Sequence, residues 1–212
     1  MVLITDIRPY KRTKLFEVYS EDGSEFLANE KFLNENEILL HSEFDDDTFE
    51  LLRAKAHLLI GIRKCVDILS RKDYSKQELL RKLCDKGIPE DAARGAVQYM
   101  AQHGYQDDYR YAKRLAELGR SSYGRRRVEQ ILYSHGIDRE TIRQVADEVF
   151  NDEAEENEKI DRILAKAVAG KNLTIPAEKQ KIFAKLARLG YTSSAISAAI
   201  SRWEKNRKDD TP

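Results

Sequence analysis

One helical pattern occurs three times along this 212-residue chain at a nearly constant spacing. Residues 74–100 align without a gap on residues 123–149 at an offset of 49, and these align on residues 177–203 at an offset of 54. One position of the pattern is glycine in all three copies: Gly87, Gly136 and Gly190. Internal repetition of this length is typical of stacked supersecondary units, so the chain is expected to form an array of small helical units.

The middle copy, residues 105–150, shows what one unit contains. Its periodicity predicts three helices: from Asp107 or Asp108 to Leu118, from 124 to 134, and one that opens at the N-cap residue Asp138. The expected inner faces carry Ala112, Leu115 and Leu118, then Val128, Ile131 and Leu132, then Ile142, Val145, Ala146 and Val149. Three short helices with tight turns predict a three-helix bundle.

The first copy, residues 49–104, has a longer leading helix. Its predicted apolar stripe comprises Leu51, Leu52, Leu58, Leu59, Ile62, Val66 and Leu69. Ser75 stands three residues before Glu78, the spacing of a capping box. Cys65 and Cys84 are expected to be small core residues in a reducing compartment, because their spacing suits neither a metal site nor a disulfide framework.

The two ends of the chain differ from the repeats. Residues 1–48 predict a β-hairpin module: strands at 2–5 and 14–19, a turn at Asp22-Gly23, a return strand at 25–28, a helical turn at 29–33 and a strand at 37–40. A lone hairpin is marginal in water, so the module should pack on the helix that follows it. Residues 151–212 form the third copy. Its leading helix is expected to run through Ala169, its extended loop to span 170–176, and its last helix to end near Trp203 before a charged tail.

Charge is balanced overall, with 37 Lys and Arg against 37 Asp and Glu, but it is unevenly distributed. Residues 1–53 carry 6 basic and 13 acidic side chains, whereas residues 54–104 carry 10 and 6. No apolar run approaches membrane-spanning length and no leader is apparent, so a cytoplasmic protein is expected.

No catalytic constellation, phosphate-binding glycine loop or metal-ligand spacing appears, so no enzyme activity, cofactor, metal or small-molecule substrate is predicted. The four histidines are scattered, and Asp107-Asp108 is interpreted as a helix start.

The strongest functional signal is a basic and aromatic stretch within residues 105–127. Arginine can bond phosphates or carboxylates through forked hydrogen bonds, and exposed tyrosines can stack on bases. The candidate binding residues are Arg110, Lys113, Arg114, Arg120, Tyr123, Arg125, Arg126 and Arg127. The competing interpretation is a solvated helix face with Tyr109 or Tyr111 in the core. Three consecutive arginines span too wide an arc for all to be buried, so some of them must face solvent.

Several of these motifs resemble the RecX family of bacterial regulatory proteins. The resemblance rests on residues 107–112, 124–128 and 132–137 in the middle copy, and on 74–80 and 82–87 in the first. The hairpin ahead of three repeats is also similar, so the resemblance spans nearly the whole chain. Two positions depart from the pattern: Gln106 replaces an aliphatic residue, and the third copy lacks the Asp-Asp-x-x-x-Ala signature.

The resemblance implies a mainly α fold of three tandem three-helix repeats in an elongated curved array, with the small N-terminal β-hairpin module. It also implies a monomeric, non-enzymatic regulator in DNA repair, homologous recombination and the SOS response. Its partners would be the recombinase RecA and the RecA filament on single-stranded DNA. Binding would modulate filament growth, strand exchange and co-protease activity; inhibition is the favoured direction, and the sequence leaves the sign of the effect open. Direct contact with single-stranded DNA stays open. Two other interpretations are a stand-alone nucleic-acid-binding repeat protein and a protein-interaction scaffold without DNA binding.

Overall fold

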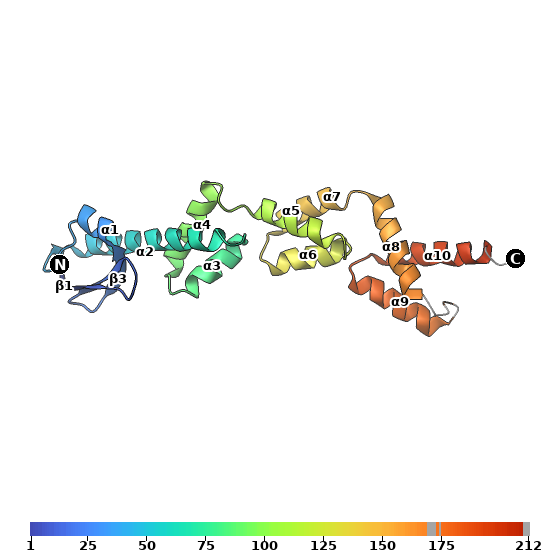
Figure 1. Cartoon of the computed structure of the whole chain (residues 1–212), viewed down its shortest axis with the longest axis horizontal. Coiled ribbons are helices and arrows are strands. Elements are labelled where there is room, and N and C mark those ends of the chain that lie inside the picture. The colour runs from blue at the N-terminus through green and yellow to red at the C-terminus, as the bar shows by residue number, and fades with distance from the viewer. Residues whose placement is uncertain (169–172, 174, 210–212) are drawn as a thin grey trace. The chain divides into compact units, whose positions relative to one another are not determined.

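The computed structural model describes residues 1–168, 173 and 175–209 of the chain, and Figure 1 shows the order of its elements. The chain divides into two compact units, residues 1–107 and 108–212. The first unit holds a small sheet and one helical bundle, and the second holds two further bundles. The finer division into four segments, 1–48, 49–104, 105–150 and 151–212, remains a prediction.

Four antiparallel strands form the sheet of the first unit, in the order β3-β2-β1-β4. The strands are β1 (Val2–Pro9), β2 (Leu15–Ser20), β3 (Glu25–Asn29) and β4 (Glu43–Phe44). The predicted hairpin turn between β2 and β3 is confirmed, because Gly23 takes a φ of 80° and Val18 pairs with Phe26 across the ladder. The β2–β3 hairpin is part of the four-stranded sheet.

The strand expected at residues 37–40 was wrong. Glu37 has a φ of 53°, which an extended strand does not allow, and the Ile38 N–H donates to the Leu33 carbonyl at 3.0 Å. The chain therefore reverses just after α1 (Glu30–Glu35) and buries Ile38 in the core. The strand that pairs with β1 at this edge of the sheet is β4 instead.

The Asp22 carboxylate organises the β2–β3 turn. Its Oδ1 accepts hydrogen bonds from the Ser20 and Ser24 hydroxyls at 2.5 and 2.6 Å and from the Ser24 N–H at 2.9 Å. These bonds lower the pKa of Asp22 from 3.8 to about 2.

A carboxylate whose pKa is lower in the folded state stabilises the fold above its unfolded pKa, and that stabilisation is lost as the pH falls through the folded pKa. We expect Asp22→Asn to lower stability at neutral pH and to flatten the loss of stability between about pH 4 and pH 2. Equilibrium unfolding at a series of pH values measures this. The same acid dependence in both proteins would contradict it.

One long helix, α2 (Asp46–Leu69), joins the sheet to the first bundle. Asp45 caps it by accepting a hydrogen bond from the Thr48 N–H at 2.8 Å. The first half packs Phe49, Leu52 and Ala56 against the sheet, and the second half packs Ile60 and Cys65 into the bundle. The expected packing of the N-terminal module on this helix is confirmed. The bundle is completed by α3 (Lys76–Cys84) and α4 (Glu90–Gln102).

Several apolar residues predicted for the cores lie on the surface instead. Their exposed fractions are 54% for Leu51, 46% for Leu59, 50% for Val66 and 68% for Leu118, and Cys84 is exposed as well. Small residues take the buried positions because the helices approach closely. A Cβ on Gly61 would lie 3.0 Å from the Ala96 Cβ, and Ala112 and Ala116 are the fully buried residues of the corresponding helix in the second unit. Of the two cysteines only Cys65 is buried, which raises its pKa to about 11.

Three equivalent turns, each with the same hydrogen-bond pattern, confirm the register of the repeats. The turns join α3 to α4, α6 (Arg125–Ser134) to α7 (Arg139–Val149), and α9 (Pro176–Arg188) to α10 (Ser193–Asp209). Gly87, Gly136 and Gly190 have φ values of 79°, 76° and 95°, which favour glycine. After each one, the N–H of Ile88, Ile137 or Tyr191 donates to the carbonyl of Leu83, Leu132 or Leu186 at 3.1, 3.3 and 3.3 Å.

The leading helices of the second unit are α5 (Asp108–Gly119) and α8 (Glu153–Val168). Ala169, the predicted end of α8, and most of the predicted loop 170–176 lie outside the described residues. The last helix does not end near Trp203 but continues to Asp209. On either side of Trp203, Arg202 pairs with Asp161 of α8 at 2.9 Å and Glu204 pairs with Lys179 of α9 at 2.9 Å.

Candidate functional site

Some of the candidate cations of the middle repeat hold its own helices together. The Lys113 Nζ donates to Glu148 at 3.0 Å, and the Tyr109 hydroxyl donates to the same carboxylate at 2.6 Å. These bonds tie α5 to α7; they lower the pKa of Glu148 and raise that of Lys113. Tyr111 lies in the core, as one of the two interpretations of the tyrosines expected.

Arg125 is also engaged within the repeat. Its Nε pairs with Glu129 at 2.7 Å, and its Nη2 pairs with Asp147 on α7 at 2.7 Å. Partial burial lowers the pKa of Arg125, but the hydrogen bonds and charges of Glu129 and Asp147 raise it by more, so the pKa of Arg125 is raised overall. Arg126 and Arg127, the other members of the arginine triplet, are exposed, as the sequence required. The Arg127 guanidinium donates a long hydrogen bond to the Gln130 side chain at 3.4 Å.

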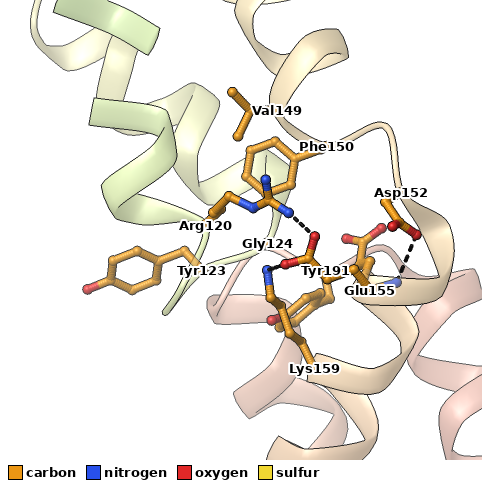
Figure 2. A pocket seen from close by; sticks show the side chains of 10 residues that line it. Arg120, Tyr123, Gly124, Val149, Phe150, Asp152, Glu155, Lys159 and Tyr191 are labelled. Atoms are coloured by element: carbon orange, nitrogen blue, oxygen red, sulfur yellow. Dashed lines mark hydrogen bonds and ion pairs between the residues drawn. The ribbon is translucent and has the colours of Figure 1, made fainter. Parts of the chain in front are cut away.

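Arg120 and Tyr123 lie where the second and third repeats meet. Figure 2 shows Arg120 bonded to Glu155 of α8, whose carboxylate also accepts from Lys159 at 2.7 Å. Burial and the neighbouring Arg120 lower the pKa of Lys159. The space that these residues enclose with Tyr191 is about 10 Å³, no more than about one water. We call this contact the inter-repeat joint, formed by Arg120, Tyr123, Gly124, Glu155, Lys159, Gly190 and Tyr191.

The backbone of the inter-repeat joint explains why a glycine, Gly124, stands at the N-cap of α6. The equivalent residue of the first repeat is Ser75, whose side chain forms a capping box with Glu78, as the sequence predicted. Gly124 has no side chain to cap α6. Its N–H donates instead to the Leu189 carbonyl at 2.8 Å, and the Arg126 N–H donates to the Gly190 carbonyl at 3.2 Å. The third repeat therefore supplies acceptors for the N-terminus of α6.

The remaining exposed cations of the middle repeat face solvent on two helices. Arg110 and Arg114 are exposed on α5, and Arg126 is exposed on α6. Arg126 lines a shallow groove of about 570 Å³ between α6 and α7. The groove residues are Arg126, Glu129, Gln130, Tyr133, Arg139, Ile142 and Arg143. We call this surface the α6–α7 groove.

The α6–α7 groove combines an aromatic residue with arginines. Tyr133 is 63% exposed, and Arg143 pairs with Glu140 at 2.7 Å. Within the part of the chain that the structure describes, Arg126 and Arg139 form no salt bridge. Exposed Tyr and Arg are the side chains most enriched at the energetic centres of protein interfaces.

Sequence reasoning missed Tyr133, Arg139 and Arg143, because they lie outside the dense basic stretch. A helical wheel would have placed Tyr133 on the face of Arg126, since the two are seven residues apart. Arg139 and Arg143 are four residues apart on α7 and so share a face as well. Their approach to α6 depends on the packing of two helices, which spacing alone does not give.

The described residues hold no group of three or more His, Cys, Asp or Glu side chains placed to bind a metal ion. Over the same residues, no helix combines the length and apolar character that a bilayer crossing requires.

The fold and its surface define a tandem three-helix repeat protein with an arginine and tyrosine groove on its middle repeat. Family models match two of the repeats: RecX, first three-helix domain, at residues 62–100, and RecX, second three-helix domain, at residues 107–145. The chain is 31% identical over 139 residues to the regulatory protein RecX of Stenotrophomonas maltophilia (strain R551-3), covering 65% of this chain and 83% of that protein. It is 32% identical to that of Vibrio vulnificus (strain CMCP6), covering 64% and 88%. The chain belongs to the RecX family.

Solved structures show the same fold. A crystal structure of regulatory protein RecX superposes with a TM-score of 0.65 at 19% identity, covering 95% of this chain and 100% of that one. The crystal structure of RecX from Lactobacillus salivarius gives 0.61 at 17%, covering 70% and 97%. The mainly helical repeat fold expected from the sequence is confirmed, and the family assignment with it.

Proposed function

We propose that this chain is a cytoplasmic, non-enzymatic regulator that binds the RecA recombinase and its filament on single-stranded DNA. Binding limits filament growth, and strand exchange and co-protease activity fall as a consequence. Membership of a family of regulatory proteins supports the proposal, and the α6–α7 groove is the observation that carries it.

The groove suits a protein partner for three reasons. Tyr133 offers a large amphipathic surface at a small cost in side-chain entropy. Arg126 and Arg139 have no salt bridge within the described residues, so an acidic partner surface would gain two ion pairs without breaking any in this chain. Ile142, only 8% exposed, forms an apolar floor between them.

The eight residues proposed from the sequence divide into two roles. Lys113, Arg120 and Arg125 form ion pairs that hold the helices and the inter-repeat joint together, and Tyr123 packs against the core of the second repeat, so we assign these four a positioning role. Arg110, Arg114, Arg126 and Arg127 are exposed, and we propose that they contact the partner. No covalent chemistry is required, since occupancy of a growing filament end blocks the next subunit.

The test is the rate of RecA-catalysed ATP hydrolysis on single-stranded DNA as the protein is titrated in, with RecA from the same organism. We expect inhibition well below one molecule per RecA, and stronger inhibition when the protein is present during filament assembly than when it is added afterwards. Inhibition that requires equimolar protein would contradict end blocking. No effect at any ratio would overturn the proposed function.

A further inference from the structure

The first repeat carries a second groove, rich in lysine, that the basic stretch of the middle repeat does not include. It lies between the end of α2 and α3 and has a volume of about 540 Å³. Its lining residues are Lys64, Asp67, Ile68, Arg71, Tyr74, Lys82 and Lys86. Four cations face one carboxylate there. We call it the α2–α3 groove.

The cations of the α2–α3 groove lack the carboxylate partners that Lys113 and Arg120 have at the positions corresponding to Lys64 and Arg71. Within the described ranges, none of Lys64, Arg71, Lys72, Lys82 and Lys86 forms a salt bridge. The repeat offset of 49 places Arg71 on Arg120 and Tyr74 on Tyr123. In the second repeat these positions serve the inter-repeat joint, where Glu155 neutralises Arg120. In the first repeat, Arg71 has no such carboxylate partner among the described residues.

The groove is held in place by Tyr74. The Lys72 and Lys82 ammonium groups lie 5.3 and 4.6 Å from the centroid of its ring, so cation–π attraction fixes two charges on one platform. The Tyr74 carbonyl accepts from the buried Gln106 amide at 3.2 Å, and the capping box of Ser75 fixes the next residue. At the other end of the groove, the Lys64 Nζ donates to the Lys86 carbonyl at 3.2 Å. The positive charges are therefore arranged before any ligand arrives.

We propose that the α2–α3 groove binds the phosphodiester backbone of single-stranded nucleic acid directly, without a protein partner. Three lysines and one arginine line the groove. Lysine ammonium groups bind phosphate oxygens as point charges, and the guanidinium of Arg71 can bind them through forked hydrogen bonds. The aromatic residue of this groove, Tyr74, is packed against the core and already lies beneath two ammonium groups, whereas Tyr133 of the α6–α7 groove is 63% exposed and available to a protein partner. A positively charged groove along the backbone is the usual electrostatic basis of single-strand binding.

The test measures the affinity of the full chain for a labelled oligothymidylate by fluorescence anisotropy over a series of salt concentrations, without RecA. The variant replaces three groove cations: Lys64→Gln, Arg71→Gln and Lys82→Gln. The control replaces three cations that already pair with carboxylates: Lys31→Gln, Arg53→Gln and Arg94→Gln. Both proteins lose the same net charge, so a difference between them reports location.

We expect the groove variant to bind at least about tenfold more weakly at low salt, and its salt slope to be smaller by about 2, since each lost phosphate contact on a single strand removes about 0.7. The control variant should keep nearly all of the parent affinity, and thermal unfolding should show that both variants are folded. Equal losses in the two variants, or a parent that does not bind, would overturn the proposal. A groove variant that binds DNA normally but no longer inhibits RecA would assign the groove to an acidic protein surface instead. Because the assay contains no RecA, failure of the proposed function leaves this result interpretable.

Discussion

Replacing Gly190 with alanine should separate the third repeat from the second. Gly190 has a φ of 95°, and an added Cβ would lie 2.3 Å from the Arg127 nitrogen and 2.5 Å from the Arg127 Cβ. Neither backbone can move without breaking the bonds that the Leu189 and Gly190 carbonyls accept from Gly124 and Arg126. Backbone strain and overpacking together should cost about 3 kcal/mol or more. Hydrogen exchange read by mass spectrometry should show faster exchange at the start of α6.

Gly87→Ala is the matched control for this prediction. Gly87 holds the same place in the first repeat with a φ of 79°, but an added Cβ would meet nothing within 4 Å. Gly87→Ala should therefore lower stability only through the unfavourable left-handed backbone conformation that alanine must adopt, by about 1–2 kcal/mol. Comparable effects of the two substitutions on stability would show that steric contact at the inter-repeat joint contributes little.

Replacing Tyr133 with alanine should weaken binding to RecA filaments at least about tenfold, because exposed aromatic residues beside arginines are the usual energetic centres of interfaces. Tyr133 is 63% exposed, so its removal should leave the unfolding free energy nearly unchanged. The equilibrium dissociation constant for filaments on single-stranded DNA measures the loss. The concentration that half-inhibits ATP hydrolysis should rise by the same factor.

Tyr105→Ala provides the comparison for Tyr133→Ala. Tyr105 is 62% exposed, so the two substitutions remove equal areas of accessible ring, but Tyr105 does not line the α6–α7 groove. The Tyr105 variant should bind filaments as the parent does. Unchanged affinity of the Tyr133 variant, with the fold intact, would remove the α6–α7 groove from the proposed function.

Much of the fold follows from local sequence signals. The glycine of each repeat turn, the capping box at Ser75 and the N-cap at Asp138 are fixed by interactions within a few residues, and all three were predicted. Positions that depend on how closely two helices approach were not. Gly61 and Ala96 bring α2 and α4 together, whereas the larger Leu51, Leu59 and Val66 lie outside the core. Large apolar residues mark a helix face poorly where small residues form the contact.

The candidate site was predictable as a region but not as a surface. Charge density pointed to the middle repeat, yet the sequence could not show which cations have carboxylates near them in space. Glu148 and Asp147 on α7 and Glu155 on α8 are distant in sequence from Lys113, Arg125 and Arg120. The lysines of the α2–α3 groove, which form no salt bridge among the described residues, were overlooked for the converse reason, since they are spread along the sequence and come together only in the folded groove.

The acceptors that the third repeat supplies to α6 have a consequence for how such a chain can change its number of repeats. The first repeat caps its own second helix, because Ser75 forms a capping box at the N-terminus of α3. The second repeat does not, because Gly124 gives α6 no side-chain cap and the carbonyls of Leu189 and Gly190 supply the acceptors instead. A lineage that lost its last repeat would need a capping residue at position 124. Conversely, a Cβ at position 124 would lie 2.8 Å from the Gly190 carbonyl carbon, so that residue could not be acquired first. Loss of the third repeat and gain of a capping residue at position 124 would therefore each be unfavourable without the other.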